Sequence, residues 1–477
     1  MLGTDSDREL TAGVDGVADQ TAADQEFADT EFADLLDRRA VDVVFLPILD
    51  LHSGQVVGLE ALARGPVGTQ FASPQALFDA GRRTGRVAEL DWVCRTAAFG
   101  AVLDAGVPPA MSLFVNVEAQ AVGSPCPPDL AHLATRAESM LRVFVEVNDR
   151  TVAADPAGVL SAVDRAREMG WGVAIDDVGA SRAPLTLLPI IQADVVKLDL
   201  RRLAGASPAD STAVVSSLLR YVERSGAALI VEGIESEADA TWARALGASY
   251  GQGFHLGAPG PLKMHYAAPL TPVGLITITP LDLEIASPFE LMSDRPHETM
   301  RAELLDRLAL LLAYGAHSTG AWPIFLIGMG REGALPVQLS QSGIPAETLL
   351  FVAFGTGLEA DAVPNVRSVR LGGRDPLADE KFVVVLGDRA PLGIFARATT
   401  DGRFDVAVTQ DRELVYSAAH HLIARVPPPG ASNRALGVLL ATGPADDARA
   451  EDRSTAGVPT AVVSAAKRGW RARLGGQ

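Results

Sequence analysis

The sequence predicts an α/β protein in which a closed barrel of alternating strands and helices is followed by a smaller α/β domain. Between Val41 and about Pro272, short β-branched runs alternate with helix-like stretches, as in a parallel sheet covered by helices on both faces. So many repeats within about 230 residues favour an eight-stranded closed barrel. An open doubly wound sheet is the alternative. The length of 477 residues leaves room for a second folded unit.

Six strand-like runs mark the predicted barrel, which we place at residues 38–270. They read VVFLPI (43–48), LFVNV (113–117), RVFVEV (142–147), GVAIDDV (172–178), DVVKLD (194–199) and ALIVEGI (228–234), and they are rich in residues that favour strands. The Pro-containing stretch APLTPVGLITITP follows and reads as a connector. We therefore expect a linker at 271–284.

A second α/β domain is expected at residues 285–427. It opens with the helix-like RPHETMRAELLDRLALLLAYG, continues with strand-like runs such as PIFLIGMG, LLFVAFG and KFVVVLG, and closes with the helix-like RELVYSAAHHLIARV. Residues 428–477 are rich in Ala, Gly and Arg and have little to bury. They are predicted to form a flexible tail.

The N-terminal residues 1–37 contain eleven acidic side chains against the single Arg8. Their apolar residues show no sustained period, so an acidic disordered tail is predicted. The formal net charge of the whole chain is -18. This charge argues against nucleic acid as a partner, because binding a phosphate backbone by bulk attraction needs clustered Lys and Arg.

Cysteine content and hydropathy indicate the compartment. The only cysteines are Cys94 and Cys126, which excludes a disulfide framework or a zinc cluster and suits a reducing cytoplasm. The sequence has no uninterrupted apolar segment of the roughly 18 to 20 residues that a membrane helix needs. We therefore expect a cytoplasmic protein without a membrane partner.

Polar residues stand at or just after the end of nearly every predicted barrel strand. They are Glu60, Asn116, Glu146, Asp176, Asp177, Lys197, Glu232 and Gln252. Their separations in the chain are close to one or two strand–helix units, so a barrel would gather them into one ring at its active face. A single acidic residue at a strand end is usually only a helix cap or a surface charge, but joint placement at this spacing favours a site.

Five carboxylates and an amide oxygen in one ring repel each other unless cations are present. Oxygen ligands without Cys or His favour hard ions, Mg²⁺ or Mn²⁺. The adjacent Asp176 and Asp177 suit a bridging and a terminal ligand for two ions about 3.5 to 4 Å apart, as in two-metal phosphoryl chemistry. Lys197 stands in an otherwise apolar strand, so it must find a counter-charge or water.

Several segments resemble the EAL domain family, which takes its name from the motif written here as Glu60, Ala61 and Leu62. The resemblance covers roughly residues 40 to 262 and includes FLPILDLHSGQVVGLEALAR, LFVNVE, VFVEVNDR, AIDDVGAS, ADVVKLD, IVEGIE and YGQGFHLGAP, in the family's order. It implies a modified TIM-like (β/α)8 barrel that hydrolyses cyclic di-GMP to linear pGpG with two Mg²⁺ or Mn²⁺ ions.

The resemblance also assigns roles to matching positions. Glu60, Asn116, Glu146 and Asp176 resemble the ligands of one metal, and Asp176, Asp177 and Glu232 those of the other. Lys197 resembles the lysine that holds the attacking water, and Asp177 and Glu232 join it as catalytic residues. Leu62, Arg64, Asp199 and Gln252 are expected beside the substrate.

Three positions depart from the family pattern. Leu46 stands where a ligand-holding Gln commonly precedes the Pro-Ile pair. The loop from Asp176 to Ser181 reads DDVGAS, where the family typically continues two aspartates with Phe, Gly, Thr and Gly. Asp149 replaces a glutamate that supports this loop. The alternative function is therefore a catalytically degenerate EAL domain that acts as a cyclic di-GMP receptor or an interaction module.

The second domain more weakly resembles the DICT sensory domain, which accompanies cyclic di-GMP enzymes. This resemblance implies that residues 285–427 receive an unknown signal or protein and regulate the barrel. A homodimer formed through the barrel is the expected assembly.

Overall fold

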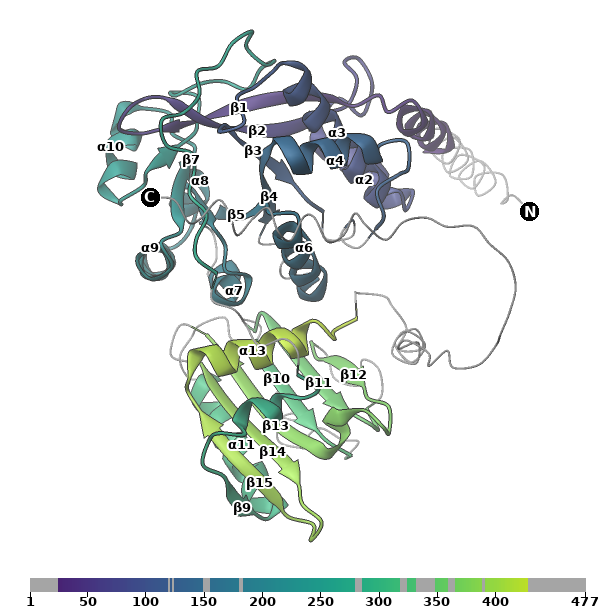
Figure 1. Ribbon diagram of the computed structural model, residues 1–477, viewed down its shortest axis with the longest axis vertical. Helices are drawn as coiled ribbons and strands as arrows, with labels where there is room; N and C mark the ends of the chain where they lie inside the picture. Colours follow the sequence, from purple (N-terminus) through teal and green to yellow (C-terminus); the bar gives the residue numbers. More distant parts are fainter. Residues whose placement is uncertain are drawn as a thin grey trace, which may run out of the picture. The chain divides into compact units, whose positions relative to one another are not determined.

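The computed structural model of the chain describes residues 25–118, 121, 124–148, 155–179, 183–278, 285–317, 324–331, 348–358, 365–387 and 391–427. The expected tail at 428–477 and the first 24 residues of the expected N-terminal tail lie outside these ranges. The described residues form a barrel and a separate sheet, each with its own helices (Figure 1).

Eight strands close into a barrel in chain order. They are β1 (Asp42–Asp50), β2 (Val56–Arg64), β3 (Ser112–Asn116), β4 (Arg142–Asn148), β5 (Gly172–Val178), β6 (Val195–Asp199), β7 (Ala228–Glu232) and β8 (Tyr250–Gly251). The predicted closed barrel is confirmed, and the open doubly wound alternative is wrong.

The barrel departs from an all-parallel sheet at β1. This strand pairs antiparallel with both β2 and β8, whereas β2 to β8 pair in parallel. Only residues 51–55 separate β1 from β2, and a parallel connection needs a crossover of a dozen or more residues. The short turn therefore forces a hairpin, which the expectation of parallel strands did not anticipate.

Helices cover the outside of the barrel. They are α2 (Pro74–Arg83), α3 (Val87–Asp104), α4 (Ala131–Met140), α6 (Pro156–Glu168), α7 (Ala183–Ile191), α8 (Leu200–Gly205), α9 (Pro208–Ser225) and α10 (Glu237–Ala245). Several begin at a side-chain cap followed by proline, as where Ser207 Oγ accepts a hydrogen bond from Asp210 N ahead of α9. No helix in the described part of the chain combines the length and apolar character needed to cross a bilayer.

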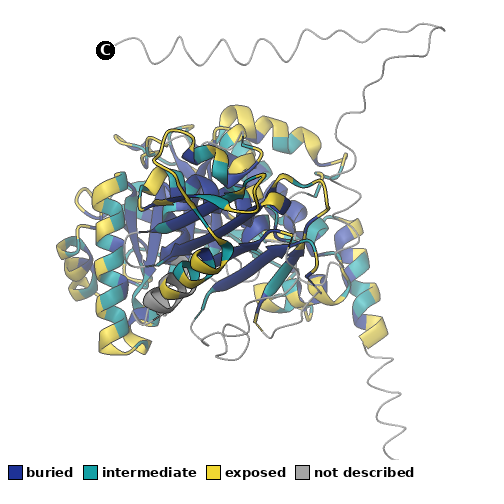
Figure 2. Cartoon of the chain, turned by 90° about the horizontal axis from the view of Figure 1, so that it is seen from below, coloured by how far each residue is buried: buried dark blue, intermediate teal, exposed yellow. Residues whose placement is uncertain are grey.

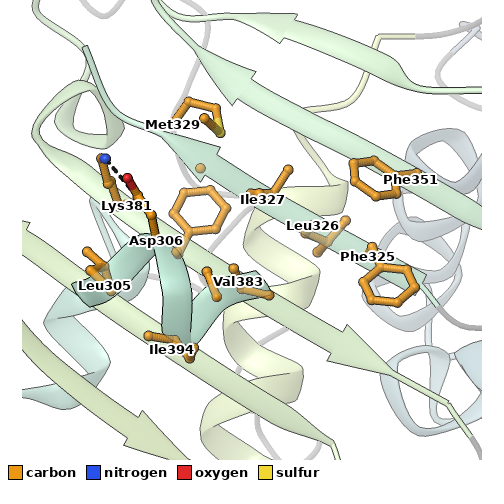
Figure 3. A pocket seen from close by; sticks show the side chains of 13 residues that line it. Leu305, Asp306, Phe325, Leu326, Ile327, Met329, Phe351, Lys381, Val383 and Ile394 are labelled. Atoms are coloured by element: carbon orange, nitrogen blue, oxygen red, sulfur yellow. Dashed lines mark hydrogen bonds and ion pairs between the residues drawn. The ribbon is translucent and has the colours of Figure 1, made fainter. Parts of the chain in front are cut away.

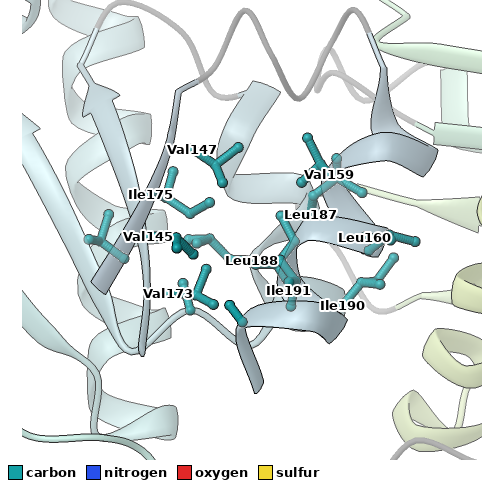
Figure 4. Packing of buried hydrophobic residues seen from close by; sticks show 14 of the residues in the cluster. Val145, Val147, Val159, Leu160, Val173, Ile175, Leu187, Leu188, Ile190 and Ile191 are labelled. Atoms are coloured by element: carbon teal, nitrogen blue, oxygen red, sulfur yellow. The ribbon is translucent and has the colours of Figure 1, made fainter. Parts of the chain in front are cut away.

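The barrel helices bury apolar side chains against the outer faces of the strands. In Figure 4, Val145 and Val147 of β4 and Val173 and Ile175 of β5 face Leu187, Leu188, Ile190 and Ile191 of α7. Figure 2 shows the same division across the molecule, with the strands dark blue and the outward helix faces yellow. The near-continuous apolar strands seen in the sequence are thus buried on both faces.

A helix through residues 25–37 replaces part of the predicted acidic tail. Phe32 and Leu36 are fully buried in a cluster with Phe71, Leu77 and Leu90. The acidic side chains of the helix remain outside, where Asp29 pairs with Arg83 at 2.9 Å and Asp37 with Arg86 at 3.0 Å. The expectation of a solvated tail was wrong for these residues, because a short apolar stripe finds its partners on α2 and α3.

The first part of the expected linker is bonded to the barrel. Val273 is fully buried, and its carbonyl accepts a hydrogen bond from Arg142 Nη2 at 2.5 Å. Ile276 N donates to Asp194 Oδ1 at 2.9 Å, and Asp194 also pairs with Arg167. The connector is therefore attached at the N-terminal ends of β4 and β6.

The second domain is a seven-stranded sheet in the order β12-β11-β10-β13-β14-β15-β9. Its elements are η2 (Pro288–Met292), β9 (Glu298–Met300), α11 (Ala302–His317), β10 (Ile324–Met329), β11 (Leu350–Gly355), β12 (Arg367–Arg370), η3 (Pro376–Asp379), β13 (Glu380–Leu386), β14 (Leu392–Ala398), β15 (Phe404–Thr409) and α13 (Arg412–Ile423). The predicted opening helix starts later than expected, because residues 298–300 pair with β15 instead. Strands β10, β11 and β12 run parallel, and the other pairs are antiparallel.

A buried polar cluster joins the start of this domain to its sheet. Glu380 of β13 is 2% exposed and accepts hydrogen bonds from Ser287 Oγ at 2.5 Å and Arg397 Nη2 at 2.8 Å. Burial raises the pKa of Glu380, although these two partners oppose the shift. The segment before η2 is therefore held to β13 and β14 by charge-assisted hydrogen bonds.

The two faces of this sheet bury different side chains. Alternate residues of β10, Phe325, Ile327 and Met329, share a cluster with Ala309 of α11. Figure 3 shows a pocket on this face, with the ion pair between Lys381 and Asp306 (3.1 Å) beside Met329. Its volume of about 40 Å³ is far below that of typical ligand sites, so we assign it no ligand.

Replacing Phe32 with Ala should destabilise the chain by about 3 to 5 kcal/mol, because the ring is fully buried beside Phe71. Phe27→Ala is the matched control on the same helix. Its ring is 71% exposed, so the change should stay within about 0.5 kcal/mol. Denaturant unfolding measures both, and equal effects would show that the helix does not pack on the barrel in solution.

Low pH should lower the folding stability of the second domain because of His421. Burial and the neighbouring Arg425 lower the pKa of His421 to about 4, and its Nε2 is buried without a hydrogen-bond partner among the described residues. The unfolded chain takes up this proton near pH 6.5 and the folded chain only near pH 4, so stability falls as pH drops between these values.

We expect wild type to lose more thermal stability between pH 7.5 and pH 5 than His421→Gln does. The exposed His297 supplies the control His297→Gln, which should retain the wild-type loss. Parallel pH profiles for wild type and His421→Gln would contradict the assignment.

Candidate metal centre

The barrel brings the predicted ring of polar residues together at one end. Each residue comes from a different strand, apart from the adjacent aspartates: Glu60 from β2, Asn116 from β3, Glu146 from β4, Asp176 and Asp177 from β5, Lys197 from β6 and Glu232 from β7, while Gln252 directly follows β8. Strands β2 to β8 point the same way, so their C-terminal halves meet at one mouth. Register supports this placement, since Asn116 pairs with Glu146 and Asp199 with Glu232.

Lys197 lies at the centre of the ring. Its Nζ is 2.7 Å from Glu146 Oε1, 2.8 Å from Glu232 Oε1, 3.1 Å from Asp176 Oδ1 and 3.3 Å from Glu60 Oε2. The side chain is fully buried. The lysine thus finds the counter-charge that its apolar strand requires, and it finds four.

Burial and mutual repulsion disturb the ionisation of this cluster. Burial raises the pKa of Glu146 well above its usual value, and Glu60 and Asp176 add to the rise. Burial likewise raises the pKa of Glu232, with Asp176 the largest repelling neighbour. Burial alone would lower the pKa of Lys197, but the carboxylates outweigh it and raise that pKa. One ammonium therefore offsets only part of the negative charge.

Two amides complete the ring. Gln252 Nε2 donates to Glu60 Oε2 and to Glu232 Oε1, both at 2.6 Å. Asn116 Nδ2 donates to Glu146 Oε2 at 3.3 Å, so the amide oxygen is the atom of Asn116 suited to a cation. Gln252 thus links carboxylates of two strands, and Asn116 holds one carboxylate of the neighbouring strand.

The donor set fits divalent cations. Glu60, Glu146 and Asp176 form one group, and Asp176, Asp177 and Glu232 form another, each with ligand atoms within 4.8 Å of one another. Glu146 Oε1 and Asp176 Oδ1 are buried and meet Lys197 as ion pairs without hydrogen-bond geometry. Such under-satisfied oxygens suit Mg²⁺ or Mn²⁺, and Asp176 belongs to both groups.

A pocket of about 240 Å³ opens beside the ring. Leu62, Arg64 and Asn116 line it, and Arg64 Nη1 donates to the carbonyl of Ala63 at 2.8 Å. Asp199, which is also expected near substrate, caps α8 by accepting a hydrogen bond from Arg201 N at 2.7 Å. The predicted loop support Asp149 lies outside the described residues.

Two arginines at the site were not predicted from the sequence. Arg95 lines the same pocket and pairs with the buried Asp91 at 2.5 Å. Arg202 of α8 pairs with Asp177 at 2.6 Å. The only signal for the first pair is its spacing of four residues on a helix. The second depends on how a loop meets a short helix, which no local pattern reveals.

Leu46 occupies the strand next to the ring. It lies directly opposite Glu60 in the register of β1 and β2, and it is half-buried. An apolar side chain thus stands beside the first carboxylate at the position where the family pattern commonly has Gln.

Comparison with known proteins finds a family match over the barrel. Residues 29–259 match the EAL domain. "Cyclic di-GMP phosphodiesterase PA2567" of Pseudomonas aeruginosa is 31% identical over 227 residues, which is 46% of this chain and 38% of that protein. "Probable cyclic di-GMP phosphodiesterase PdeB" of Escherichia coli K12 is 26% identical over 231 residues, or 46% of this chain and 43% of that protein. The match thus spans less than half of either relative.

Solved structures also resemble about half of this chain. The PaMucR phosphodiesterase in complex with c-di-GMP has a TM-score of 0.41 and 24% identity, covering 49% of this chain and 96% of its own. Klebsiella pneumoniae BlrP1, in a complex with manganese and cyclic di-GMP, has a TM-score of 0.40 and 25% identity, covering 46% and 56%. Residues 29–259, which contain all eight barrel strands, match the EAL domain, and the relatives of this chain include proteins named as cyclic di-GMP phosphodiesterases.

Proposed function

We propose that the barrel hydrolyses cyclic di-GMP to linear pGpG with two divalent cations, Mg²⁺ or Mn²⁺. The observation that supports this most directly is the convergence of five carboxylates from four strands into two overlapping ligand groups around Lys197. The EAL match and the names of the relatives support cyclic di-GMP as the substrate.

The ligand groups divide the work of holding the ions. Glu60, Asn116, Glu146 and Asp176 would hold one ion, and Asp176, Asp177 and Glu232 the second. Bound ions of this kind lower the pKa of water and neutralise charge that develops on a phosphate. Gln252 bridges Glu60 and Glu232 and orients both through its two hydrogen bonds.

Lys197 is placed to act on the nucleophile. Its Nζ stands among the ligands of both groups, from which it can donate a hydrogen bond to an attacking water and hold it in line with the scissile P–O bond. Arg64 and Leu62 line the pocket beside the ring, where they would bind the rest of the dinucleotide. Addition of one water opens one phosphodiester bond and leaves a linear product with a terminal phosphate.

A receptor without turnover is the second candidate function. Leu46 beside Glu60 favours it, because one polar contact to the ligand is replaced by an apolar side chain. The altered loop after Asp177 also belongs to this alternative. Binding of cyclic di-GMP without product would identify a receptor.

The second domain would regulate the barrel, and a homodimer through the barrel would be the active assembly. The DICT-like sensory role rests on the resemblance noted in the sequence. The attachment of the connector to β4 and β6 supplies a route from one folded unit to the other.

Turnover should depend on the ring. With Mg²⁺ or Mn²⁺, purified protein should convert cyclic di-GMP to pGpG, and Glu60→Gln or Asp176→Asn should lower the rate by more than about a hundredfold, because each removes a metal ligand. Glu237→Gln is the control, since that side chain is exposed on α10. Product chromatography beside calorimetric titration separates the functions: binding without product supports the receptor, and neither binding nor product contradicts both.

Lys197→Met should destabilise the metal-free chain by about 3 to 5 kcal/mol, because four carboxylates lose their shared cation. Manganese should restore part of the loss by taking over that charge. The exposed Lys263 supplies the control Lys263→Met, which should leave stability unchanged. Thermal unfolding with and without Mn²⁺ measures both effects, and a variant that manganese does not stabilise would contradict a cation site at the ring.

A further inference from the structure

Arg202 of α8 places a second fixed cation at the ring. Its Nη2 lies 2.6 Å from Asp177 Oδ2. Asp177 belongs to the second ligand group, together with Asp176 and Glu232, and not to the first. A protein cation therefore already contacts one of the two carboxylates, Asp177 and Glu232, that belong to the second group alone.

The surrounding backbone holds Arg202 in this position. Asp199 caps α8 and accepts a hydrogen bond from Arg202 N at 3.3 Å. Gly179, just after β5, lies so close to α8 that a Cβ there would be 2.8 Å from the carbonyl oxygen of Asp199 and 3.0 Å from Arg202 Cβ. Asp177 itself has a φ of 63°, a left-handed conformation that is uncommon outside glycine. The pair is thus positioned by the strand end and the helix start together.

The position of Arg202 matters because of the balance of charges at the ring. Lys197 contacts Glu60, Glu146, Asp176 and Glu232, and Arg202 contacts the fifth carboxylate. Two divalent ions together with Lys197 would neutralise five carboxylates. Arg202 is a further cation at the second group. It is shared there between Asp177 and Asp199, whose Oδ2 is 3.9 Å from Arg202 Nε, so an ion at Asp177 has to share that carboxylate with the guanidinium. Like charges at such short range repel, because the site is partly removed from water.

We propose that Arg202 is a built-in competitor of the second metal ion. It neutralises Asp177 in the metal-free protein and weakens binding at Asp176, Asp177 and Glu232 relative to Glu60, Glu146 and Asp176. The two ions consequently bind in order, and the second fills only at higher metal concentration. This inference rests on the proposed two-metal function and adds an asymmetry between its two groups.

Arg201 provides a matched control one residue away. Its Nη2 pairs with Glu235 at 2.7 Å, and both side chains are about 60% exposed. Arg201→Gln removes the same charge from the same helix without touching a ligand group. Arg202→Lys keeps the charge of Arg202 but not its planar group.

The test measures Mn²⁺ binding to the full chain. Calorimetry gives the affinities, and the electron paramagnetic resonance signal of paired manganese ions reports when both sites are filled. Wild type should bind two ions with unequal affinities. Arg202→Gln should tighten the weaker site about tenfold, or about 1.4 kcal/mol, and lower the thermal stability of the metal-free protein. Arg201→Gln and Arg202→Lys should retain the wild-type difference between the sites.

Failure of this inference is distinct from failure of the proposed function. One outcome is that wild type binds two ions while Arg202→Gln leaves the affinity of the weaker site unchanged or lowers it. That result would contradict the proposal that Arg202 competes with the second ion, but it would still support the two-metal site. Tightening in Arg202→Lys equal to that in Arg202→Gln would overturn the charge argument. Wild type that binds no manganese would overturn the proposed function and this inference together.

Discussion

The ammonium of Lys197 is the interaction on which the mouth of the barrel depends. Four carboxylates from four strands approach it within 3.3 Å. A buried carboxylate without a partner is strongly destabilising, so this convergence would otherwise push the strand ends apart. The lysine allows the closed sheet to keep its acidic residues together before any ion arrives. In the proposed function the same oxygens would form the donor set of a hard cation, so folding and metal affinity would depend on one cluster.

The ring could be predicted from the sequence because strand ends of a closed parallel sheet must meet. Glu146, Asp176 and Glu232 follow apolar runs, and this placement alone brings them to one mouth. The pairing of Asp177 with Arg202 could not be predicted in the same way. It depends on Gly179 allowing a loop to lie against a six-residue helix, which is a contact between segments and not a period within one. The reversed β1 shows a related limit: strand runs are visible in the sequence, but the direction of a strand follows from the length of its turn.

Prediction from local composition was wrong where a segment packs on a surface formed by residues that are distant in the sequence. Eleven acidic residues dominate positions 1–37, yet Phe32 and Leu36 are enough to seat residues 25–37 as a helix on a surface formed by Phe71, Leu77 and Leu90. Likewise, the residues before Ala302 continue a helical pattern but pair with β15 instead. In both cases tertiary contact overrides a weak intrinsic preference.

The connector is attached to two strands that also carry residues of the ring. Arg142 begins β4 and Asp194 immediately precedes β6, and these two residues grip Val273 and Ile276. Glu146 lies four residues after Arg142, and Lys197 lies three residues after Asp194. The same two strands therefore contact the connector at one end and form the shortest ion pair of Lys197, with Glu146, at the other. At about 3.3 Å per residue, each strand is a rigid rod of roughly 10 to 13 Å. Only the length of these two strands, each of which pairs with β5 between them, thus separates the attached connector from the centre of the ring.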